Sequence, residues 1–479
     1  IFQPMQITNI SNLIKKNKKH YKIFKYAQEV SEDLNTSVYL VGGYVRDILL
    51  KNDLKDIDLM VEENAKLFSE KLSKKLNVNK VIKFEKFHTY RIPYPECEIE
   101  VANSRKESYD PSSRKPTKVE LTNLEGDLER RDFTINSMAA SLSSSNFGDI
   151  YDPFNGMQDL NNAIIKTPCD ADTTFSDDPL RMLRAIRFAC QLDINIDNST
   201  LASIKKQSDR IKIISWERIT AELIKILSTK KPSKGFYLLQ DTNLLTYVFP
   251  ELCLMPGVEV IDGKSHKDVF IHTLEVVDNA AQLTDKMEIR FAALVHDIAK
   301  PQTKRFFKDK GWTFHGHEEI GKRMLVKVAQ RMKLSSNLRD YLMILTKLHL
   351  RPIALAKKGI TDKAVRRVMF EAGEYIDDLM VLCRADITTK NPKKVKKYMN
   401  NFEKVEDLMQ DVKMRDEMRA FKSPIDGHII MKEFKLTEGR EIGNIKTQIE
   451  EAILDGIIDN NYDAAYKFML TIKKTSNSK

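Results

Sequence analysis

The chain has 479 residues, of which 42% are hydrophobic, so it is too long for one hydrophobic core and apolar enough for several. Its net charge of +10 indicates a polyanionic partner, and its five scattered cysteines, with no Cys-x-x-Cys pair, indicate neither a disulfide framework nor a zinc knuckle. Because no apolar run approaches the roughly 18 residues of a membrane helix, the sequence predicts a soluble, cytoplasmic protein that does not contact the membrane.

The first predicted elements lie within residues 38–60, VYLVGGYVRDILLKNDLKDIDLM. An apolar, β-branched run predicts a strand, Gly42 and Gly43 predict a turn, and residues 44–50 predict a short helix. Backbone N–H groups in a glycine turn before a helix favour an anion such as phosphate.

A second strand follows and carries Asp56 and Asp58. Side chains two residues apart on a strand share a face, and paired carboxylates suit Mg²⁺. A solvated strand is the alternative, because Asp-x-Asp pairs are common. Glu98 and Glu100 share a face of a later predicted strand, so either is a candidate third carboxylate.

A helix is predicted at 64–76, and further strands are predicted at 78–84, 89–93 and 96–102. Residues 103–122 are polar and basic without a hydrophobic period, which predicts a loop. Its charge suits RNA or a triphosphate, and a plain flexible insertion remains equally possible.

Arg130, Arg131 and Asp132 precede an apolar run that reads as a helix. Adjacent guanidinium groups at a helix start can bind phosphate bidentately. Two solvated arginines beside a capping aspartate are the alternative. Residues 150–160, with a proline and a glycine between acids, predict a hinge.

The next predicted helix starts at Asp178, a candidate cap, and carries Arg181, Arg184 and Arg187 at intervals of three. Asp178 and Arg181 offer an acceptor and donors to a base edge, while the later arginines suit phosphates. A simple cap and a solvated arginine face fit the same spacing. Glu217, Arg218 and Glu222 follow on another helix, where pairing at i,i+4 is the simplest reading.

A second group of chemical residues begins at His266, since six of the nine histidines lie between it and His349. His296 and Asp297 interrupt an apolar helix predicted at 289–299, and both side chains can reach one metal ion. The set that would complete this metal site is His272, His296, Asp297 and Asp386, with His317 and His349 for a second metal or a phosphate.

The last part of the chain, from about 392, begins with four lysines and continues as amphipathic helices. This pattern suits RNA, and a solvated helix bundle is the alternative.

These motifs together resemble the class II nucleotidyltransferase superfamily, in particular bacterial CCA-adding enzymes with a C-terminal HD domain, over nearly the whole chain. The family's base-pairing motif is normally Glu-Asp-x-x-Arg; Asp177 takes the Glu position here, and Asp178 and Arg181 are kept. The resemblance implies an α+β fold: a small mixed-sheet nucleotidyltransferase head, an all-α neck and an all-α HD domain. The implied boundaries are 1–36 for a helical lead, 37–165 for the head, 166–262 for the neck, 263–400 for the HD domain and 401–479 for a tRNA-binding tail.

The resemblance also implies roles for these residues. Asp56 and Asp58 would hold catalytic Mg²⁺, helped by Glu100 in preference to Glu98, while Glu217 to Glu222 would brace the base-pairing helix. The implied nucleotide-binding residues are Gly42, Gly43, Arg46, Arg130, Arg131, Asp132, Asp178, Arg181, Arg184 and Arg187.

The implied activity is addition of CCA to tRNA from CTP and ATP without a nucleic-acid template. The HD set implies a phosphohydrolase that uses Ni²⁺, Co²⁺, Mn²⁺ or Fe²⁺ and acts on tRNA ends. The alternatives left open are CC-only or A-only addition, a poly(A) polymerase on the same head, and an HD phosphohydrolase whose head only binds RNA.

Overall fold

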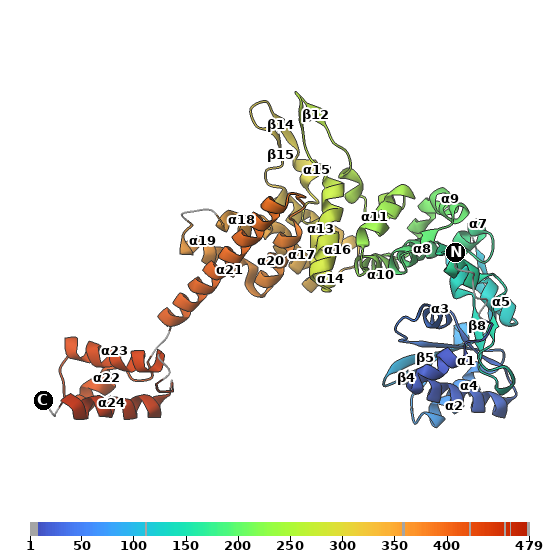
Figure 1. Cartoon of the computed structure of the whole chain (residues 1–479), viewed down its shortest axis with the longest axis horizontal. Helices are drawn as coiled ribbons and strands as arrows, with labels where there is room; N and C mark the ends of the chain where they lie inside the picture. Colours follow the sequence, from blue (N-terminus) through green and yellow to red (C-terminus); the bar gives the residue numbers. More distant parts are fainter. Residues whose placement is uncertain are drawn as a thin grey trace. The chain divides into compact units, whose positions relative to one another are not determined.

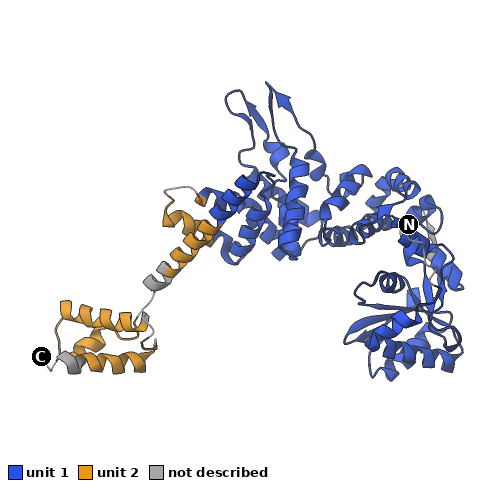
Figure 2. Ribbon diagram, in the orientation of Figure 1, with its two compact units in different colours: residues 1–354, 370–402 blue, residues 355–369, 403–479 orange. Residues whose placement is uncertain are grey.

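The computed structural model describes residues 8–110, 113–356, 360–420, 423–454, 457–459 and 461–476. The chain forms two compact units, one of residues 1–354 and 370–402 and one of residues 355–369 and 403–479 (Figure 2). No helix in the described part of the chain is both long and apolar enough to cross a membrane.

The head is a mixed seven-stranded sheet covered by helices (Figure 1). The strands in spatial order are β3 (Ile82–Phe84), β4 (Thr89–Tyr94), β5 (Cys97–Asn103), β2 (Ile57–Val61), β1 (Val38–Val41), β8 (Ala139–Ser141) and β9 (Ile150–Tyr151). Only the β2–β5 pair is parallel in this sheet. The head helices are α1 (Ser11–Lys16), α2 (Lys18–Leu34), α3 (Gly43–Leu50), α4 (Ala65–Lys75), α5 (Leu124–Glu129) and α6 (Gly156–Asn161).

The core of the head lies between this sheet and its helices. Phe24 of α2 and Phe68 of α4 are fully buried against Ile99 of β5 and neighbouring strand residues. Burying large apolar side chains on one face holds the sheet flat against α2 and α4, and this fixes the positions of the strand ends that carry the acids.

Two head predictions are wrong. The predicted loop at 103–122 is an antiparallel ribbon of β6 (Arg105–Asp110) and β7 (Ser113–Leu121), with Pro111 and the side chains of 107–117 outside the described residues. The segment has no hydrophobic period, and its strands are defined by pairing with each other, which a local sequence pattern does not reveal. The apolar run after Asp132 was predicted to be a helix, but it forms a 3₁₀ turn (Thr134–Asn136) and strand β8. The prediction failed because a short strand buried on both faces has the same continuous apolar pattern as a buried helix.

The neck is helical, apart from a short parallel pair of β10 (Ile164–Ile165) and β11 (Asn195–Ile196). Its helices are α7 (Ala171–Asp177), α8 (Leu180–Gln191), α9 (Asn198–Gln207), α10 (Trp216–Leu227), α11 (Pro232–Asp241) and α12 (Leu245–Val248), with 3₁₀ turns at Ser208–Ile213 and Leu252–Leu254.

The HD region is also helical, and two short antiparallel ribbons are added to it. Its helices are α13 (Val269–Leu283), α14 (Met287–Val295), α15 (Lys300–Thr303), α16 (His317–Arg331), α17 (Ser336–Leu348), α18 (Arg351–Leu355), α19 (Asp362–Ala372) and α20 (Ile376–Ala385), with a 3₁₀ turn at Gly373–Tyr375. The ribbons are β12 (Val260–Ile261) with β13 (Lys264–Ser265), and β14 (Arg305–Phe307) with β15 (Gly311–Thr313). The helix predicted at 289–299 ends at Val295, so His296 and Asp297 lie in the turn after it.

The long helix α21 (Pro392–Ala420) leads to a C-terminal bundle of α22 (Gly427–Phe434), α23 (Arg440–Leu454) and α24 (Tyr462–Ser476). This bundle has its own small core, which includes Ile430, Ile449 and Met469. The predicted α+β class, with a mixed-sheet head before a helical body, is confirmed.

Candidate metal centres and nucleotide-binding region

The turn between β1 and α3 is restricted to glycine. Gly42 has φ +67°, a left-handed value, and a Cβ added there would lie 2.8 Å from Nη1 of Arg131. The same Cβ would lie 3.6 Å from Oδ2 of Asp58. The predicted glycine turn therefore brings the backbone at the N-terminus of α3 next to an acid and an arginine from other parts of the head.

The acids of the head lie on or beside two neighbouring parallel strands. Asp58 on β2 lies directly opposite Glu100 on β5. Asp56 precedes β2, and its Oδ1 accepts a hydrogen bond of 3.4 Å from the backbone N–H of Glu98. Arg91 of β4 lies 3.6 Å from Glu100 and 3.4 Å from Glu98.

The electrostatics of Asp58 fit a cation site. Burial is the main cause that raises the pKa of its carboxyl; Arg131 opposes this, Glu100 and Asp56 add to it, and the resulting pKa is about 6. A partly buried carboxyl near two other acids is stabilised in its charged form by positive charge, which a divalent cation would supply. The residues present therefore fit Mg²⁺ with oxygen ligands.

Asp127 is a buried residue that sequence analysis missed, and it holds two predicted nucleotide-binding arginines. Its Oδ1 accepts from Arg130 at 2.6 Å and its Oδ2 accepts from Arg131 at 2.9 Å. Burial would raise the pKa of Asp127, but these guanidinium groups lower it to about 2. The available signal was its position three and four residues before the arginines, which places all three side chains together on a helical turn.

Arg46 has a different environment from the one expected. It is buried, donates two hydrogen bonds to Asp47 and donates one of 2.6 Å to Oδ1 of Asn136. Asn136 in turn donates to Asp132. This chain of bonds joins α3 to the turn before β8, so the position of Arg46 favours a structural role over contact with a nucleotide.

Asp132 connects the head to helix α8. Its Oδ2 accepts from Nη2 of Arg184 at 2.6 Å, and its Oδ1 accepts from the backbone N–H of Phe133 at 2.9 Å. Burial would raise the pKa of Asp132, but Arg184 and its other partners hold it at about 2. Asp132 thus binds the backbone of the next residue and fixes Arg184.

The start of α8 carries the predicted base-pairing residues. Oδ1 of Asp178 accepts the backbone N–H of Leu180 at 3.1 Å, so the predicted capping contact is present. Oδ2 of Asp178 lies 3.3 Å from Nη2 of Arg218 on α10. Arg181 donates to the carbonyl of Arg130 at 2.6 Å, which holds its guanidinium against the head.

Helix α10 holds α8 through a second ion pair. Glu222 accepts a 2.7 Å hydrogen bond from Nε of Arg187, and both side chains are buried. The simple i,i+4 reading of Arg218 and Glu222 is wrong, because the two residues pair with separate partners on or beside α8. The burial of Arg187 favours a structural role over the expected contact with the triphosphate.

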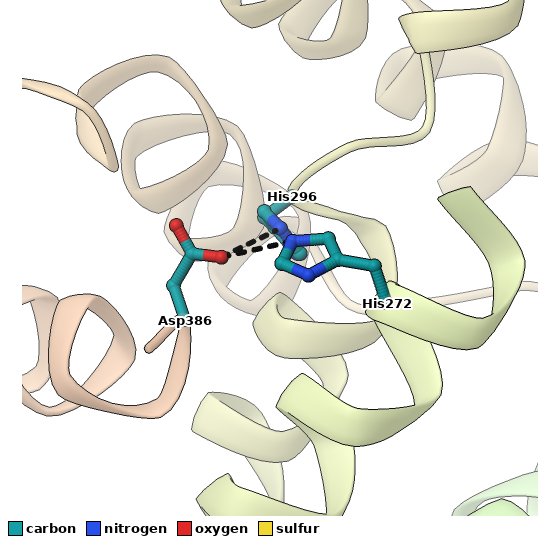
Figure 3. A group of neighbouring side chains, drawn as sticks. All are labelled: His272, His296 and Asp386. Carbon is teal, nitrogen blue, oxygen red and sulfur yellow. Dashed lines mark ion pairs between the residues drawn. The ribbon is translucent and has the colours of Figure 1, made fainter. Parts of the chain in front are cut away.

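In the HD region, His272, His296 and Asp386 lie close together although they come from distant parts of the chain (Figure 3). Oδ1 of Asp386 is 3.0 Å from Nε2 of His272 and 3.7 Å from Nε2 of His296. Asp297, His317 and His349 form a second such group, and in each group the ligand atoms lie within 4.8 Å of one another.

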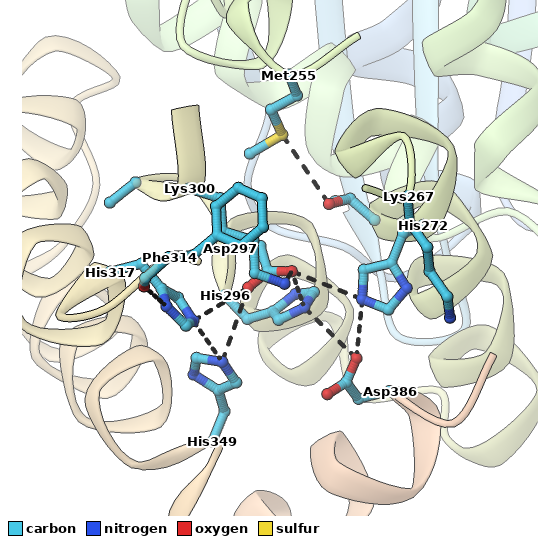
Figure 4. A network of polar contacts seen from close by, with 12 residues as sticks. Met255, Lys267, His272, His296, Asp297, Lys300, Phe314, His317, His349 and Asp386 are labelled. Carbon is cyan, nitrogen blue, oxygen red and sulfur yellow. Dashed lines mark hydrogen bonds and ion pairs between the residues drawn. The ribbon is translucent and has the colours of Figure 1, made fainter. Parts of the chain in front are cut away.

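Asp297 stands between the two groups (Figure 4). Its Oδ2 is 3.1 Å from Nε2 of His296, and its Oδ1 is 3.4 Å from Nε2 of His317. Burial would raise the pKa of Asp297, but the neighbouring His296 and Lys300 hold it well below its usual range. A carboxylate that directs one oxygen to each group is suited to bridge two metal ions.

The histidine rings are oriented for ligation. Nδ1 donates to a backbone carbonyl at 2.8 Å in His296, 2.7 Å in His317 and 2.7 Å in His349. Nδ1 of His272 lies 3.0 Å from Oγ1 of Thr388. Since a carbonyl can only accept, Nδ1 of His296, His317 and His349 carries a proton, and Nε2 is the ring atom that faces the centre. The hydroxyl of Thr388, which can donate or accept, orients the ring of His272.

Unsatisfied atoms in this centre also fit metal ions. Nε2 of His296 and both carboxylate oxygens of Asp297 are buried without a hydrogen bond among the described residues, although Lys300 lies 2.5 Å from one of these oxygens. Nε2 of His317 and Nε2 of His349 lie 3.3 Å apart. Two nitrogen lone pairs at that distance require a cation or a proton between them. Burial lowers the pKa of His349 to about 4, which disfavours the proton and favours a metal ion.

Three domain families match the chain: a poly A polymerase head domain over residues 38–166, a probable RNA- and SrmB-binding site of polymerase A over 193–255, and an HD domain over 269–390. The multifunctional CCA protein of Tolumonas auensis is 30% identical over 364 residues, which cover 73% of this chain and 84% of that protein.

Solved structures agree with this match at the level of the fold. A CCA-adding enzyme in apo form II has a TM-score of 0.60 and 22% identity, covering 97% of this chain and 98% of its own. The Thermotoga maritima CCA-adding enzyme complexed with tRNA has a TM-score of 0.57 and 21% identity, with coverage of 97% and 98%.

Proposed function

Because the chain belongs to the family of the multifunctional CCA proteins, with a polymerase head, an RNA-binding region and an HD domain in that order, we propose that it adds CCA to tRNA 3′ ends from CTP and ATP. The observation that carries the proposal is the position of Asp58, beside Glu100 and next to the Gly42 turn. Relatives solved with tRNA, with ATP and with CTP support the substrates, and a tRNA substrate supports the proposed cytoplasmic location.

In this proposal Asp56, Asp58 and Glu100 hold Mg²⁺. When bound there, Mg²⁺ stabilises charge as the tRNA 3′-hydroxyl attacks the α-phosphate and pyrophosphate leaves. The N–H of Gly43, at the start of α3, binds a phosphate oxygen beside Arg131, while the N–H of Gly42 donates to the carbonyl of Met138 and holds the turn. The geometry of Asp127 keeps Arg130 and Arg131 in place for the same anion.

Base selection is assigned to the start of α8. Asp178 offers a carboxylate acceptor and Arg181 offers guanidinium donors, which together can read a cytosine or an adenine edge. Arg184, fixed by Asp132, lies on the same helix and suits the ribose or a phosphate. Arg46 and Arg187 are reassigned from nucleotide binding to holding α3 and α8 in position.

The HD centre supports a second proposed activity, hydrolysis of phosphate esters at tRNA ends. His272, His296, Asp297 and Asp386 would hold one transition-metal ion, and His317 and His349 with Asp297 a second. Imidazole-rich sites suit Ni²⁺, Co²⁺, Mn²⁺ or Fe²⁺, which activate water for attack on phosphorus. Residues 263–400 are assigned to this domain, and 401–479 to tRNA binding.

The test of the head is incorporation of labelled CTP and ATP, with Mg²⁺, into a tRNA transcript that ends at its discriminator base. Wild type, Asp56→Ala/Asp58→Ala and the control Asp53→Ala, an exposed acid in the same segment, are compared. Three added nucleotides in wild type and control, with none in the double variant, are expected.

Other outcomes identify the alternatives. Long A tails would indicate a poly(A) polymerase, and two cytidines or a single adenosine would indicate a CC-adding or an A-adding enzyme. No addition by wild type would leave an HD phosphohydrolase whose head only binds RNA.

A further inference from the structure

Two short ribbons of the HD region, β12–β13 and β14–β15, lie side by side and project from its helices (Figure 1). Nε1 of Trp312 donates to the carbonyl of Lys264 at 3.1 Å, and Nζ of Lys264 donates to the carbonyl of Lys308 at 2.7 Å. These contacts join β13 to β15 and to the turn after β14, so the ribbons support each other.

An aromatic layer fills the space between the ribbons. The ring of His266 lies 5.2 Å from that of Trp312 and 5.8 Å from that of Phe314, and the ring of Phe306 lies 5.3 Å from Trp312. His266 is fixed by both ring nitrogens, since Nδ1 bonds to the carbonyl of Lys267 and Nε2 accepts from the N–H of Glu259. The two ribbons are therefore packed against each other and are not independent loops.

This layer reaches the HD centre directly. The carbonyl of Phe314 accepts the Nδ1 proton of His317, and the ring of Phe314 lies 5.7 Å from Nζ of Lys300, which contacts Asp297. Figure 4 shows Lys267, Lys300 and Phe314 around the same group of ligands. A molecule bound on the ribbons would thus lie next to the metal ligands.

The other face of β14 is exposed. Arg305 and Phe307 are two residues apart and share this face, and the ring of Phe307 is 47% exposed. Gly311 is the partner of Phe307 across the ribbon, so the position directly opposite the ring carries no side chain. A half-exposed ring on the same face as a cation is a platform on which a base can stack.

The ribbons carry an excess of positive charge. Residues 259–267 and 300–315 contain seven Lys or Arg and three acids. Lys304 pairs with Glu259, whereas among the described residues no acid pairs with Lys264, Lys267, Arg305, Lys308 or Lys310. Unpaired cations around an exposed aromatic ring match the chemistry of a nucleic-acid strand, with phosphates for the cations and a base for the ring.

We propose that the exposed side chains of these ribbons (Lys264, Lys267, Arg305, Phe307, Lys308 and Lys310), named here the ribbon surface, bind single-stranded RNA and deliver its terminal phosphate ester to the HD centre. The inference rests on the proposed phosphohydrolase activity and adds to it that the substrate is recognised as a strand rather than as a single nucleotide.

The test compares two substrates with the same reactive group, a nucleoside 2′,3′-cyclic phosphate and a ten-nucleotide RNA that ends in one. In both, water adds to phosphorus, one ester P–O bond breaks and the leaving oxygen takes a proton. The variants are Phe307→Ala and Arg305→Ala/Lys308→Ala/Lys310→Ala. The control is Lys66→Ala/Lys71→Ala/Lys74→Ala, which removes three charges from α4 of the head.

For both ribbon variants, kcat/KM on the oligonucleotide is expected to fall about tenfold, mainly through KM, because base stacking and phosphate contacts are lost. Their kcat/KM on the nucleotide is expected to stay within about twofold of wild type, and the control is expected to match wild type on both substrates. Equal losses on the two substrates, or no loss on the oligonucleotide, would overturn the proposal.

If wild type hydrolyses neither substrate with any of the four metals, the proposed HD activity fails, and RNA binding then tests the ribbon surface separately. The fluorescence anisotropy of the labelled decamer would be titrated at several salt concentrations. The triple variant is expected to lower the slope of log K against log salt by about 2, since each phosphate contact on a single strand contributes about 0.7. An unchanged slope, or binding of anionic lipid vesicles in place of RNA, would overturn the proposal.

Discussion

Asp127 is not itself proposed to contact a substrate, but it orients Arg130 and Arg131, which are. Each of its carboxylate oxygens accepts from a different guanidinium group, and Arg131 also lies against the site where Gly42 must have no side chain. The neutral amide of an asparagine has only one acceptor oxygen, so it cannot hold both arginines.

We therefore expect Asp127→Asn to lower kcat for nucleotide addition about 100-fold, which is the cost of displacing a positioning group by about 1 Å. Glu125→Gln, an exposed acid on the same helix, is the matched control and should leave kcat unchanged. Single-turnover addition of one cytidine measures the effect, and a variant as fast as wild type would show that Arg130 and Arg131 need no such support.

Asp127 and Asp132 also predict how the head responds to acid. Both pKa values are lowered to about 2 from 3.8, so each carboxylate stabilises the folded head above pH 4, and this contribution is lost as the pH falls toward 2. The shift corresponds to about 2 kcal/mol per residue. Hydrogen exchange of residues 124–141, corrected for the intrinsic effect of pH, should accelerate steeply between pH 4 and pH 2. In Asp127→Asn this dependence should be weaker, and an equally steep response would contradict the assignment.

At the scale of elements, α10 holds the base-reading end of α8 in position. Arg218 contacts one oxygen of Asp178, while the N–H of Leu180 contacts the other, so the carboxylate has a defined orientation. Base selection depends on that orientation because one hydrogen bond in the wrong direction removes the discrimination that it provides.

Arg218→Ala is expected to reduce the preference for CTP over ATP at the first added position about tenfold, since a hydrogen bond to a charged group contributes about 1.5–3 kcal/mol. The ratio of the two kcat/KM values measures this. Lys225→Ala, which removes an exposed partner of Glu222 on the same helix, should preserve the ratio. If Arg218→Ala also kept the wild-type ratio of kcat/KM for CTP to that for ATP, α10 would have no role in base selection.

The elements that the sequence predicted well are those with local signals. The run from β1 through Gly42 to α3 and β2 has a turn residue, a period and strand composition that all agree within 25 residues. The ribbon β6–β7 was missed because its sequence has no hydrophobic period, and strand β8 was missed because it is buried on both faces. Pairing of Asp58 with Glu100, 42 residues away, depends on strand order, which no local pattern contains.

The HD centre could also be predicted only in part from the sequence. The types of its ligands were visible in the sequence, and the structure brings all six together. A second group containing His317 and His349 was expected, but the place of Asp297 between the two groups was not, because that depends on which oxygen each histidine faces. The ribbon surface was also missed, since it depends on the pairing of β14 with β15, which places Phe307 opposite a glycine.

At the scale of the whole molecule, the chain carries two centres of different ligand chemistry. The head offers only carboxylate oxygens, whereas the HD centre offers four imidazoles with two aspartates. Carboxylates select hard ions such as Mg²⁺, and imidazoles select transition metals, so one chain can load both without exchange. The C-terminal bundle has its own core and shares no ligand with either centre among the described residues.

This difference predicts that the two activities can be removed one at a time. With Mg²⁺ in excess, 1,10-phenanthroline should abolish hydrolysis of the cyclic phosphate and leave CCA addition within about twofold, because it binds transition metals far more tightly than Mg²⁺. His296→Ala/Asp297→Ala should act like the chelator, and Asp58→Ala should have the opposite effect. His315→Ala, an exposed histidine beside the centre, is the control for the HD pair. Loss of addition in the HD pair while its circular dichroism spectrum matches wild type would mean that the head requires the HD metals, and the two centres would then be one coupled site.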